Sequence, residues 1–181
     1  MEEEDHIKVV FLGETDVGKT NLIKRYITGN FEDFGHTKGA SYSTKKINCD
    51  KKDYYFDLWD TSGYDRYRAL AKIFISNANI IVLVYNITNK QSFLELDNWV
   101  DTVLEGLGPE VCFILVGNKN DLYENEVITE EDGKKYARII KAKFINTSAK
   151  VDHWQWNNFL ENALKDYIYS RKNNKKSKLF I

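Results

Sequence analysis

The chain has 181 residues, of which 43% are hydrophobic and 29% are charged, a balance typical of a globular protein with a sizeable core. Its 26 basic and 27 acidic residues give a formal net charge of -1, which excludes a bulk electrostatic attraction to nucleic acid. The two cysteines are isolated, give neither a metal-binding spacing nor a disulfide framework, and fit a reducing compartment. No apolar run approaches the roughly 20 residues of a membrane-spanning helix. We expect a single domain over residues 1–181.

Strand-like runs alternate with helical patterns along the chain. Two of these runs are continuously apolar, which suits strands buried on both faces of a parallel sheet. A more polar run is joined by a turn to a β-rich run, which predicts a hairpin with an edge strand. In chain order, the strand-like runs are residues 7–12, 41–47, 54–59, 80–85, 111–116 and 144–146.

The helical patterns fall between these runs. Apolar residues recur every three or four positions over 96–107, and a Gly-Pro pair ends that pattern. Thr129, followed by three acidic residues, is typical of a helix N-cap. The last helix carries an apolar stripe over 159–168, where we expect Trp156 to face the core and Trp154 to be exposed. The alternation predicts an α/β fold with a six-stranded, mostly parallel sheet flanked by helices on both faces.

A phosphate-binding motif follows the first predicted strand. Residues 13–20 read Gly-Glu-Thr-Asp-Val-Gly-Lys-Thr, which is G-x-x-x-x-G-K-[ST] between an apolar strand and an apolar helix pattern. The glycines let several backbone N–H groups converge on one anion. Lys19 is placed to reach the outer phosphates, and the Thr20 hydroxyl to ligate Mg²⁺. The motif predicts a nucleoside triphosphate without specifying the base.

An acidic residue follows the strand-like run 54–59. Asp60 opens the sequence Asp-Thr-Ser-Gly, and an acid at the tip of a buried strand beside a phosphate loop can hold Mg²⁺ directly or through water. The N–H of Gly63 is then placed to touch a terminal phosphate. Taken alone, Asp60 could instead be a turn residue that caps the next helix.

Two later loops indicate which base is bound. Residues 118–121, Asn-Lys-Asn-Asp, follow the strand-like run 111–116 after one glycine. The Asp121 carboxylate can accept two N–H groups from guanine, and adenine presents no such pair of donors. The Lys119 stem can lie along the base. The second loop, residues 147–150, reads Thr-Ser-Ala-Lys and follows the strand-like run 144–146, and its Ala149 N–H can bond the guanine O6. We therefore expect a guanine nucleotide.

From about residue 8 to 169 the chain resembles a Ras-superfamily small GTPase, and it is most similar to the Rab family. Besides the four loops above, Rab-like phrases are Leu-Trp-Asp-Thr at 58–61, Arg-Tyr-Arg-Ala-Leu at 66–70 and Thr-Glu-Glu-Asp-Gly at 129–133. The resemblance implies a P-loop NTPase G domain that binds GTP and GDP with Mg²⁺ and hydrolyses GTP slowly. It also implies a monomer in the cytoplasm or on the cytosolic face of endomembranes, with a role in vesicle trafficking. Exchange factors, GTPase-activating proteins and effectors would bind through switch I and switch II, but no nucleic acid would bind.

The resemblance also assigns roles to individual residues. Lys19, Gly63 and Tyr64 are expected at the catalytic centre, and Thr20, Thr37 and Asp60 at the metal. Phe31 is expected to pack on the nucleotide. The nucleotide-binding residues are expected to be Asp16, Val17, Gly18, Lys19, Thr20, Asn21, Phe31, Thr37, Gly63, Asn118, Lys119, Asp121, Ser148, Ala149 and Lys150.

The chain departs from the family pattern in several places. Tyr64 stands where the family has its catalytic glutamine, and the stretch 31–37 is one residue shorter than in a Rab. No prenylation cysteine follows the basic tail 171–181, so we expect weak, salt-sensitive membrane association. Two alternatives remain open: a non-hydrolysing GTP-binding module or scaffold, and a P-loop kinase for a small molecule. The loop 118–121 speaks against the kinase.

Overall fold

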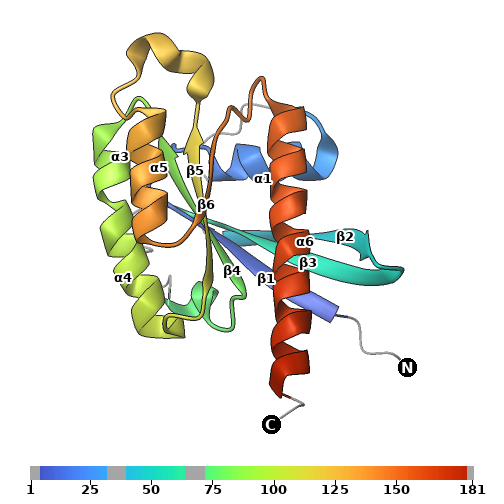
Figure 1. The fold of residues 1–181 in the computed structure, drawn as a ribbon. Coiled ribbons are helices and arrows are strands. Elements are labelled where there is room, and N and C mark those ends of the chain that lie inside the picture. The colour runs from blue at the N-terminus through green and yellow to red at the C-terminus, as the bar shows by residue number, and fades with distance from the viewer. Residues whose placement is uncertain (1–4, 32–39, 64–71, 179–181) are drawn as a thin grey trace.

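The computed structural model describes residues 5–31, 40–63 and 72–178. Within them, six strands form one sheet in the order β2-β3-β1-β4-β5-β6 (Figure 1). Only the β2–β3 pair is antiparallel, which confirms the predicted six-stranded, mostly parallel sheet. The strands are β1 (Asp5–Leu12), β2 (Ala40–Cys49), β3 (Lys52–Thr61), β4 (Ile80–Asn86), β5 (Cys112–Asn118) and β6 (Lys143–Asn146).

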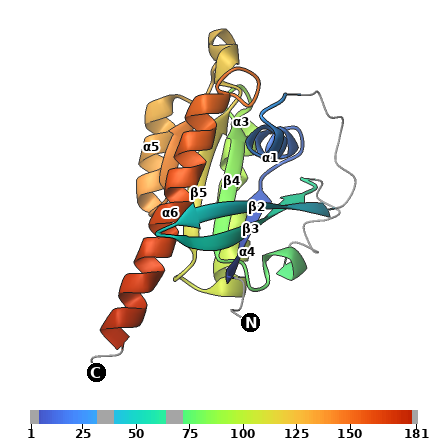
Figure 2. The same ribbon diagram turned by 90° about the vertical axis from the view of Figure 1, so that its right-hand side faces the viewer.

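Helices cover both faces of the sheet, as the alternating pattern predicts. Figures 1 and 2 show α1 and α6 on one face and α3, α4 and α5 on the other. The helices are α1 (Lys19–Thr28), α3 (Lys90–Leu94), α4 (Leu96–Leu107), α5 (Glu130–Ile139) and α6 (His153–Lys178), with a 3₁₀ segment η1 (Asn120–Asn125). Among the residues described, no helix combines the length and the apolar character that crossing a bilayer needs.

The strands follow from their sequence patterns. Every residue of β4 is buried, as its continuous apolar run requires for a central strand covered on both faces. Along β3, buried and partly exposed residues alternate, because this strand lies nearer the sheet edge. The β2–β3 hairpin turns at Asp50 and Lys51, which have φ of 54° and 64°, the positive values that a tight two-residue turn needs.

Two apolar cores, one on each face of the sheet, hold the layers together. The first packs β1, β3 and β4 against α1 and α6, and includes Trp156. The second packs the opposite face against α4 and α5, and includes Trp99. The Trp156 side chain is fully buried and its indole N–H donates to the Leu22 carbonyl at 2.9 Å, whereas Trp154 is 72% exposed. Both tryptophan predictions are confirmed.

Candidate functional site

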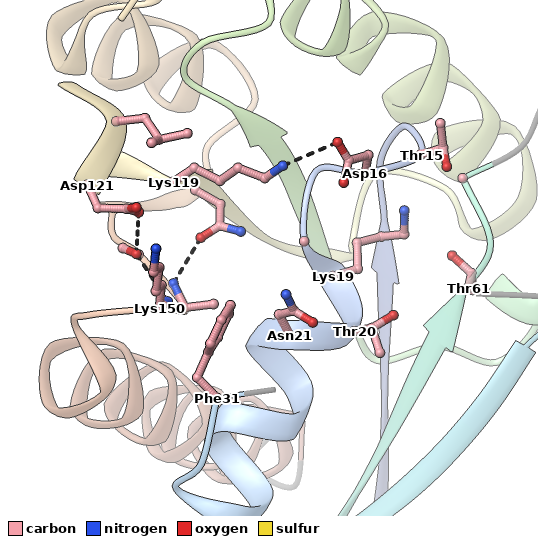
Figure 3. Close-up of a pocket in the computed structure, with 16 residues that line it drawn as sticks. Thr15, Asp16, Lys19, Thr20, Asn21, Phe31, Thr61, Lys119, Asp121 and Lys150 are labelled. Atoms are coloured by element: carbon pink, nitrogen blue, oxygen red, sulfur yellow. Dashed lines mark hydrogen bonds and ion pairs between the residues drawn. The ribbon is translucent and has the colours of Figure 1, made fainter. Parts of the chain in front are cut away.

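A pocket of about 480 Å³ opens at the carboxyl ends of the parallel strands, the edge where sheets of this kind bind ligands. The loops that leave β1, β3, β5 and β6 all contribute to it (Figure 3). It therefore joins four chain segments that are far apart in sequence. Its lining residues are Thr15, Asp16, Gly18, Lys19, Thr20, Asn21, Phe31, Thr61, Gly63, Asn118, Lys119, Asp121, Leu122, Ser148, Ala149 and Lys150.

The loop between β1 and α1 has the conformation that its glycines permit. Gly13 and Gly18 have φ of 142° and 95°, which other residues rarely adopt. A Cβ on Gly18 would lie 2.2 Å from the Asn118 side-chain nitrogen, so a larger residue would push apart the first loop and the loop after β5. Gly18 is also the N-cap of α1. The pocket thus receives the N-terminus of α1, whose first-turn N–H groups and dipole favour an anion.

Lys19 is the buried cation of the pocket. Its side chain is 5% exposed, and its Nζ donates to the carbonyls of Gly13 and Glu14, each at 2.8 Å. Burial lowers the pKa of Lys19 to about 8, because the charged form loses its hydration, while the carboxylates of Asp60, Glu14 and Asp16 oppose this effect. An anion at this position would replace the lost hydration and stabilise the ammonium form.

Thr20 and Asp60 form a pair of oxygen donors beside Lys19. The Thr20 hydroxyl donates to Asp60 Oδ2 at 2.6 Å, and Asp60 Oδ1 is buried with no hydrogen-bond partner among the described residues. Burial raises the pKa of Asp60, whereas the Thr20 hydrogen bond and the charge of Lys19 lower it. A buried carboxylate oxygen without a partner next to a hydroxyl suits a hard divalent cation such as Mg²⁺. These two residues therefore fit the expected metal.

The opposite end of the pocket is built around Asn118. Its side chain is 1% exposed, donates to the Val17 carbonyl at 2.8 Å and accepts from the Ala149 N–H at 3.1 Å. The Asn118 amide thus connects the end of β5 to the loop between β1 and α1 and to the loop after β6. The Ser148 hydroxyl donates to Asp121 Oδ1 at 2.5 Å. The carboxylate expected to read the base is therefore held in place by a side chain of the loop after β6.

The structure brings together most of the predicted site residues but not all of them. Phe31 lines the pocket and also packs against the first core. Val17 does not line the pocket, because its side chain is 1% exposed and belongs to that core, which leaves only its backbone to meet a ligand. The Ala149 N–H, expected at a base oxygen, is already engaged by Asn118. Thr37 and Tyr64 lie outside the described residues.

Gly63 is in direct contact with the loop between β1 and α1. A Cβ at this position would lie 2.2 Å from Glu14 C and 2.2 Å from Thr15 N, so only a glycine fits against that peptide. The loop after β3 therefore packs closely against the loop after β1. The role of the Gly63 N–H toward a terminal phosphate stays a prediction.

Sequence reasoning missed three residues that line the pocket: Thr15, Thr61 and Leu122. Each lies within or next to one of the motifs, so closeness to a motif in the sequence was the signal that could have identified them. Thr61 donates its hydroxyl to the Phe11 carbonyl at 2.6 Å, a contact between β3 and β1 that no local pattern indicates. The Trp99 indole N–H, which approaches Glu14 Oε1 at 3.2 Å from α4, was missed for the same reason.

Comparison with known proteins agrees with this geometry. A model of the Ras family matches residues 8–168. The proteins named Ras-related protein Rab-21 from Bos taurus and Homo sapiens are 42% identical to the chain over 144 residues, and that from Mus musculus is 41% identical over 144 residues. The matches cover 79% of this chain and 65%, 64% and 65% of those relatives, so the chain spans just under two thirds of their length.

The match to the family model runs from within β1 to within α6 and includes all four loops of the pocket. The resemblance stated from the sequence motifs is confirmed. The chain belongs to the Ras family of small GTPases, and within it is similar to the Rab-21 proteins.

Proposed function

We propose that the chain binds GTP and GDP with Mg²⁺ in this pocket, hydrolyses GTP slowly and acts as a Rab-like switch in vesicle trafficking. The observation that carries the proposal is the convergence of a buried Lys19 with the Asn118–Asp121 loop on one pocket. Lys19 would bind the phosphates, and the Asn118–Asp121 loop would bind the base. Membership of the Ras family and the similarity to Rab-21 proteins support it.

The residues divide the pocket into three tasks. Lys19 and the N–H groups at the start of α1 would hold the phosphates, and Phe31 would pack on the nucleotide. Asp121 would accept the N–H donors of guanine, with Asn118 and Ser148 holding its loop in place. Thr20 and Asp60, joined in the triphosphate state by Thr37, would hold Mg²⁺. A divalent cation held by these residues would supply positive charge that stabilises the negative charge of the phosphates.

Hydrolysis asks little covalent chemistry of the protein. It requires the attacking water to be aligned with the terminal phosphate while Lys19 and backbone N–H groups stabilise the developing charge. The family aligns the water with a glutamine amide after the switch II glycine, and this chain has Tyr64 there. A phenol offers one hydroxyl on a rigid ring and no amide. We therefore propose an intrinsic rate well below that of a glutamine-bearing relative.

Tyr64 also favours a second candidate function, a GTP-binding module that does not hydrolyse. In that case the chain would remain in one nucleotide state and serve as a scaffold for effectors. Single-turnover hydrolysis of bound GTP separates the two candidates. The switch should release phosphate at a measurable rate that depends on Mg²⁺, whereas the non-hydrolysing module should release none.

A switch of this kind would have three classes of protein partner. Exchange factors, activating proteins and effectors would bind through the two switch segments, which γ-phosphate contacts order in this family. An activating protein could supply the missing glutamine and an arginine in trans. We propose that the chain works as a monomer in the cytosol or on the cytosolic face of endomembranes, where its basic tail alone would give weak, salt-sensitive attachment.

Base selectivity tests the proposal directly. A fluorescent GDP analogue bound to the purified chain should be displaced by GTP and GDP, and not by ATP at the same concentration. Lys19→Ala should abolish binding, whereas Lys165→Ala, which removes an α6 lysine paired with Glu161 at 2.7 Å, should bind like the wild type. Equal displacement by ATP would refute the assignment of the base loop.

A further inference from the structure

A second pocket, of about 600 Å³, lies beside β6. Within the described part of the chain, β6 is the last strand of the sheet and pairs only with β5. Figures 1 and 2 show α5 and α6 on opposite faces of the sheet. The pocket takes Glu130 from α5 and Phe159 from α6. Because it draws on the helices of both faces, the pocket opens at the free edge of β6.

The free edge of β6 presents backbone groups to this pocket. Phe144, Ile145 and Asn146 line it. The Thr147 N–H donates to the Gly117 carbonyl of β5 at 2.8 Å, so it points into the sheet. Backbone groups alternate in direction along a strand, so the N–H and C=O of Ile145 also point into the sheet, whereas those of Phe144 and Asn146 point outward. An extended peptide beside β6 would form hydrogen bonds with these outward groups.

The same pocket carries a carboxylate whose charge no neighbour balances. Glu130 pairs with Lys134 at 2.6 Å, so their charges cancel. Glu126 is exposed, and its carboxylate forms no ion pair or hydrogen bond among the described residues. The rings of Tyr123 and Phe159 also line the pocket, and Tyr123 is 69% exposed. A free carboxylate and aromatic rings in one pocket suit a guanidinium or ammonium group, which pairs with the carboxylate and stacks on a ring.

The positive charge that fits this pocket does not come from the same chain. The basic residues at the end of α6 are too distant, because Lys178 lies about 35 Å along the helix from Gln155 at a rise of about 1.5 Å per residue. A second copy that paired its β6 with this one would bring its own Glu126, and two equal charges would repel each other. A different protein with a basic segment is the occupant that the charges favour.

We propose that this pocket binds an extended segment of a partner protein that carries an arginine or lysine side chain. The segment would add a strand to β6, and its basic side chain would pair with Glu126. None of the described lining residues comes from β2, β3 or the loop between β1 and α1. Binding should therefore be the same with GDP or with GTP bound, unlike the binding of a partner at the switch segments. The inference does not depend on the proposed nucleotide chemistry.

The first test selects binders to the purified chain from a library of random nine-residue peptides. The enriched peptides should carry an arginine or lysine among β-prone residues, and fluorescence polarisation then measures their affinity. Glu126→Gln removes the charge at nearly constant volume and should weaken binding about fivefold. Glu124→Gln is the matched control, because Glu124 is also exposed and belongs to η1 but does not line the pocket. Its affinity should equal that of the wild type.

The second test detects the added strand itself. The backbone amides of Phe144 and Asn146 should exchange with solvent more slowly when an enriched peptide is bound, as measured by NMR. N-methylation of the peptide should abolish binding at alternate positions, since only every second N–H of a strand faces its neighbour.

Four outcomes would overturn the inference: no enriched peptide, enriched peptides without a basic residue, equal affinity for Glu126→Gln and wild type, or unchanged exchange at Phe144 and Asn146. Self-association of the chain that protects these two amides would identify a second copy as the occupant and would also overturn it. Failure of the chain to bind guanine nucleotide would count against the proposed function alone, because the peptide measurements do not require a nucleotide.

Discussion

At the scale of single residues, the proposed base site contains one hydrogen-bonded carboxylate, that of Asp121. Ser148 donates its hydroxyl to Asp121, and backbone N–H groups of Lys150 and Val151 donate to the Ser148 oxygen at 3.1 and 3.3 Å. Ser148 is thereby fixed by its own loop and in turn orients Asp121. In the proposed function, base choice would follow from the acceptor pair that this carboxylate presents.

Converting Asp121 to Asn should change the preferred base. An amide offers one acceptor and one donor group, which suits xanthine better than guanine. Hydrogen bonds to charged groups contribute about 1.5–3 kcal/mol, so GTP affinity should fall by at least about tenfold while XTP affinity rises. Competition against a fluorescent nucleotide measures both. Unchanged GTP binding by Asp121→Asn would show that another residue reads the base.

The sequence predicted the pocket well at this scale, because the motif residues sit at strand ends that a parallel sheet must bring together. It could not predict contacts between residues far apart in the chain. The Thr61 hydroxyl bonds to Phe11, and the Ala149 N–H bonds to Asn118. Both depend on the distance between strands and loops after folding, and that distance leaves no local pattern in the sequence.

At the scale of elements, α5 begins with a complete capping box. The Thr129 hydroxyl accepts from the Asp132 N–H at 3.2 Å, and the Asp132 carboxylate accepts from the Thr129 N–H at 3.1 Å. Thr129→Ala removes one of these bonds and should lower the free energy of unfolding by about 1 kcal/mol. Denaturant unfolding measures the loss. Nucleotide affinity should not change, since α5 contributes no residue to the pocket lining.

The N-terminal turns of α6 provide a matched pair of tryptophans. Trp156 is fully buried, meets Phe11 edge-on at a centroid distance of 6.4 Å and bonds to Leu22 of α1. Trp156→Ala should cost about 3–5 kcal/mol of unfolding free energy. Trp154→Ala, at a 72% exposed position, should cost no more than about 0.5 kcal/mol. Similar losses from both changes would contradict the placement of α6 on the sheet.

The existence and type of these elements could be predicted because their periodicity is strong, but their ends could not. The apolar stripe of the last helix covers 159–168, whereas α6 runs from His153 to Lys178. The strand expected at 54–59 extends over Lys52–Thr61. In β3 the added residues pair with β1 and β2 in the sheet, and such pairing depends on the neighbouring strands.

At the scale of the whole molecule, one departure from the family pattern bears on the whole GTP cycle. Tyr64 would slow the hydrolysis of GTP. The proposed function therefore predicts a chain whose GTP-bound state lasts longer than that of a glutamine-bearing relative. The four loops of the pocket would meet around one nucleotide, so nucleotide at 100 times its Kd should also stabilise the fold by about 2.7 kcal/mol.

Single-turnover hydrolysis of bound GTP tests the central claim most directly, with wild type and Tyr64→Gln measured side by side. Both proteins should bind one GTP, because phosphates, metal and base meet other residues. Tyr64→Gln should approach the rate of a glutamine-bearing relative, about 10⁻⁴ per second, and the wild type should be at least about tenfold slower. Fast hydrolysis by the wild type, or no gain in Tyr64→Gln, would contradict the role assigned to Tyr64. Failure of the wild type to bind GTP would contradict the account as a whole.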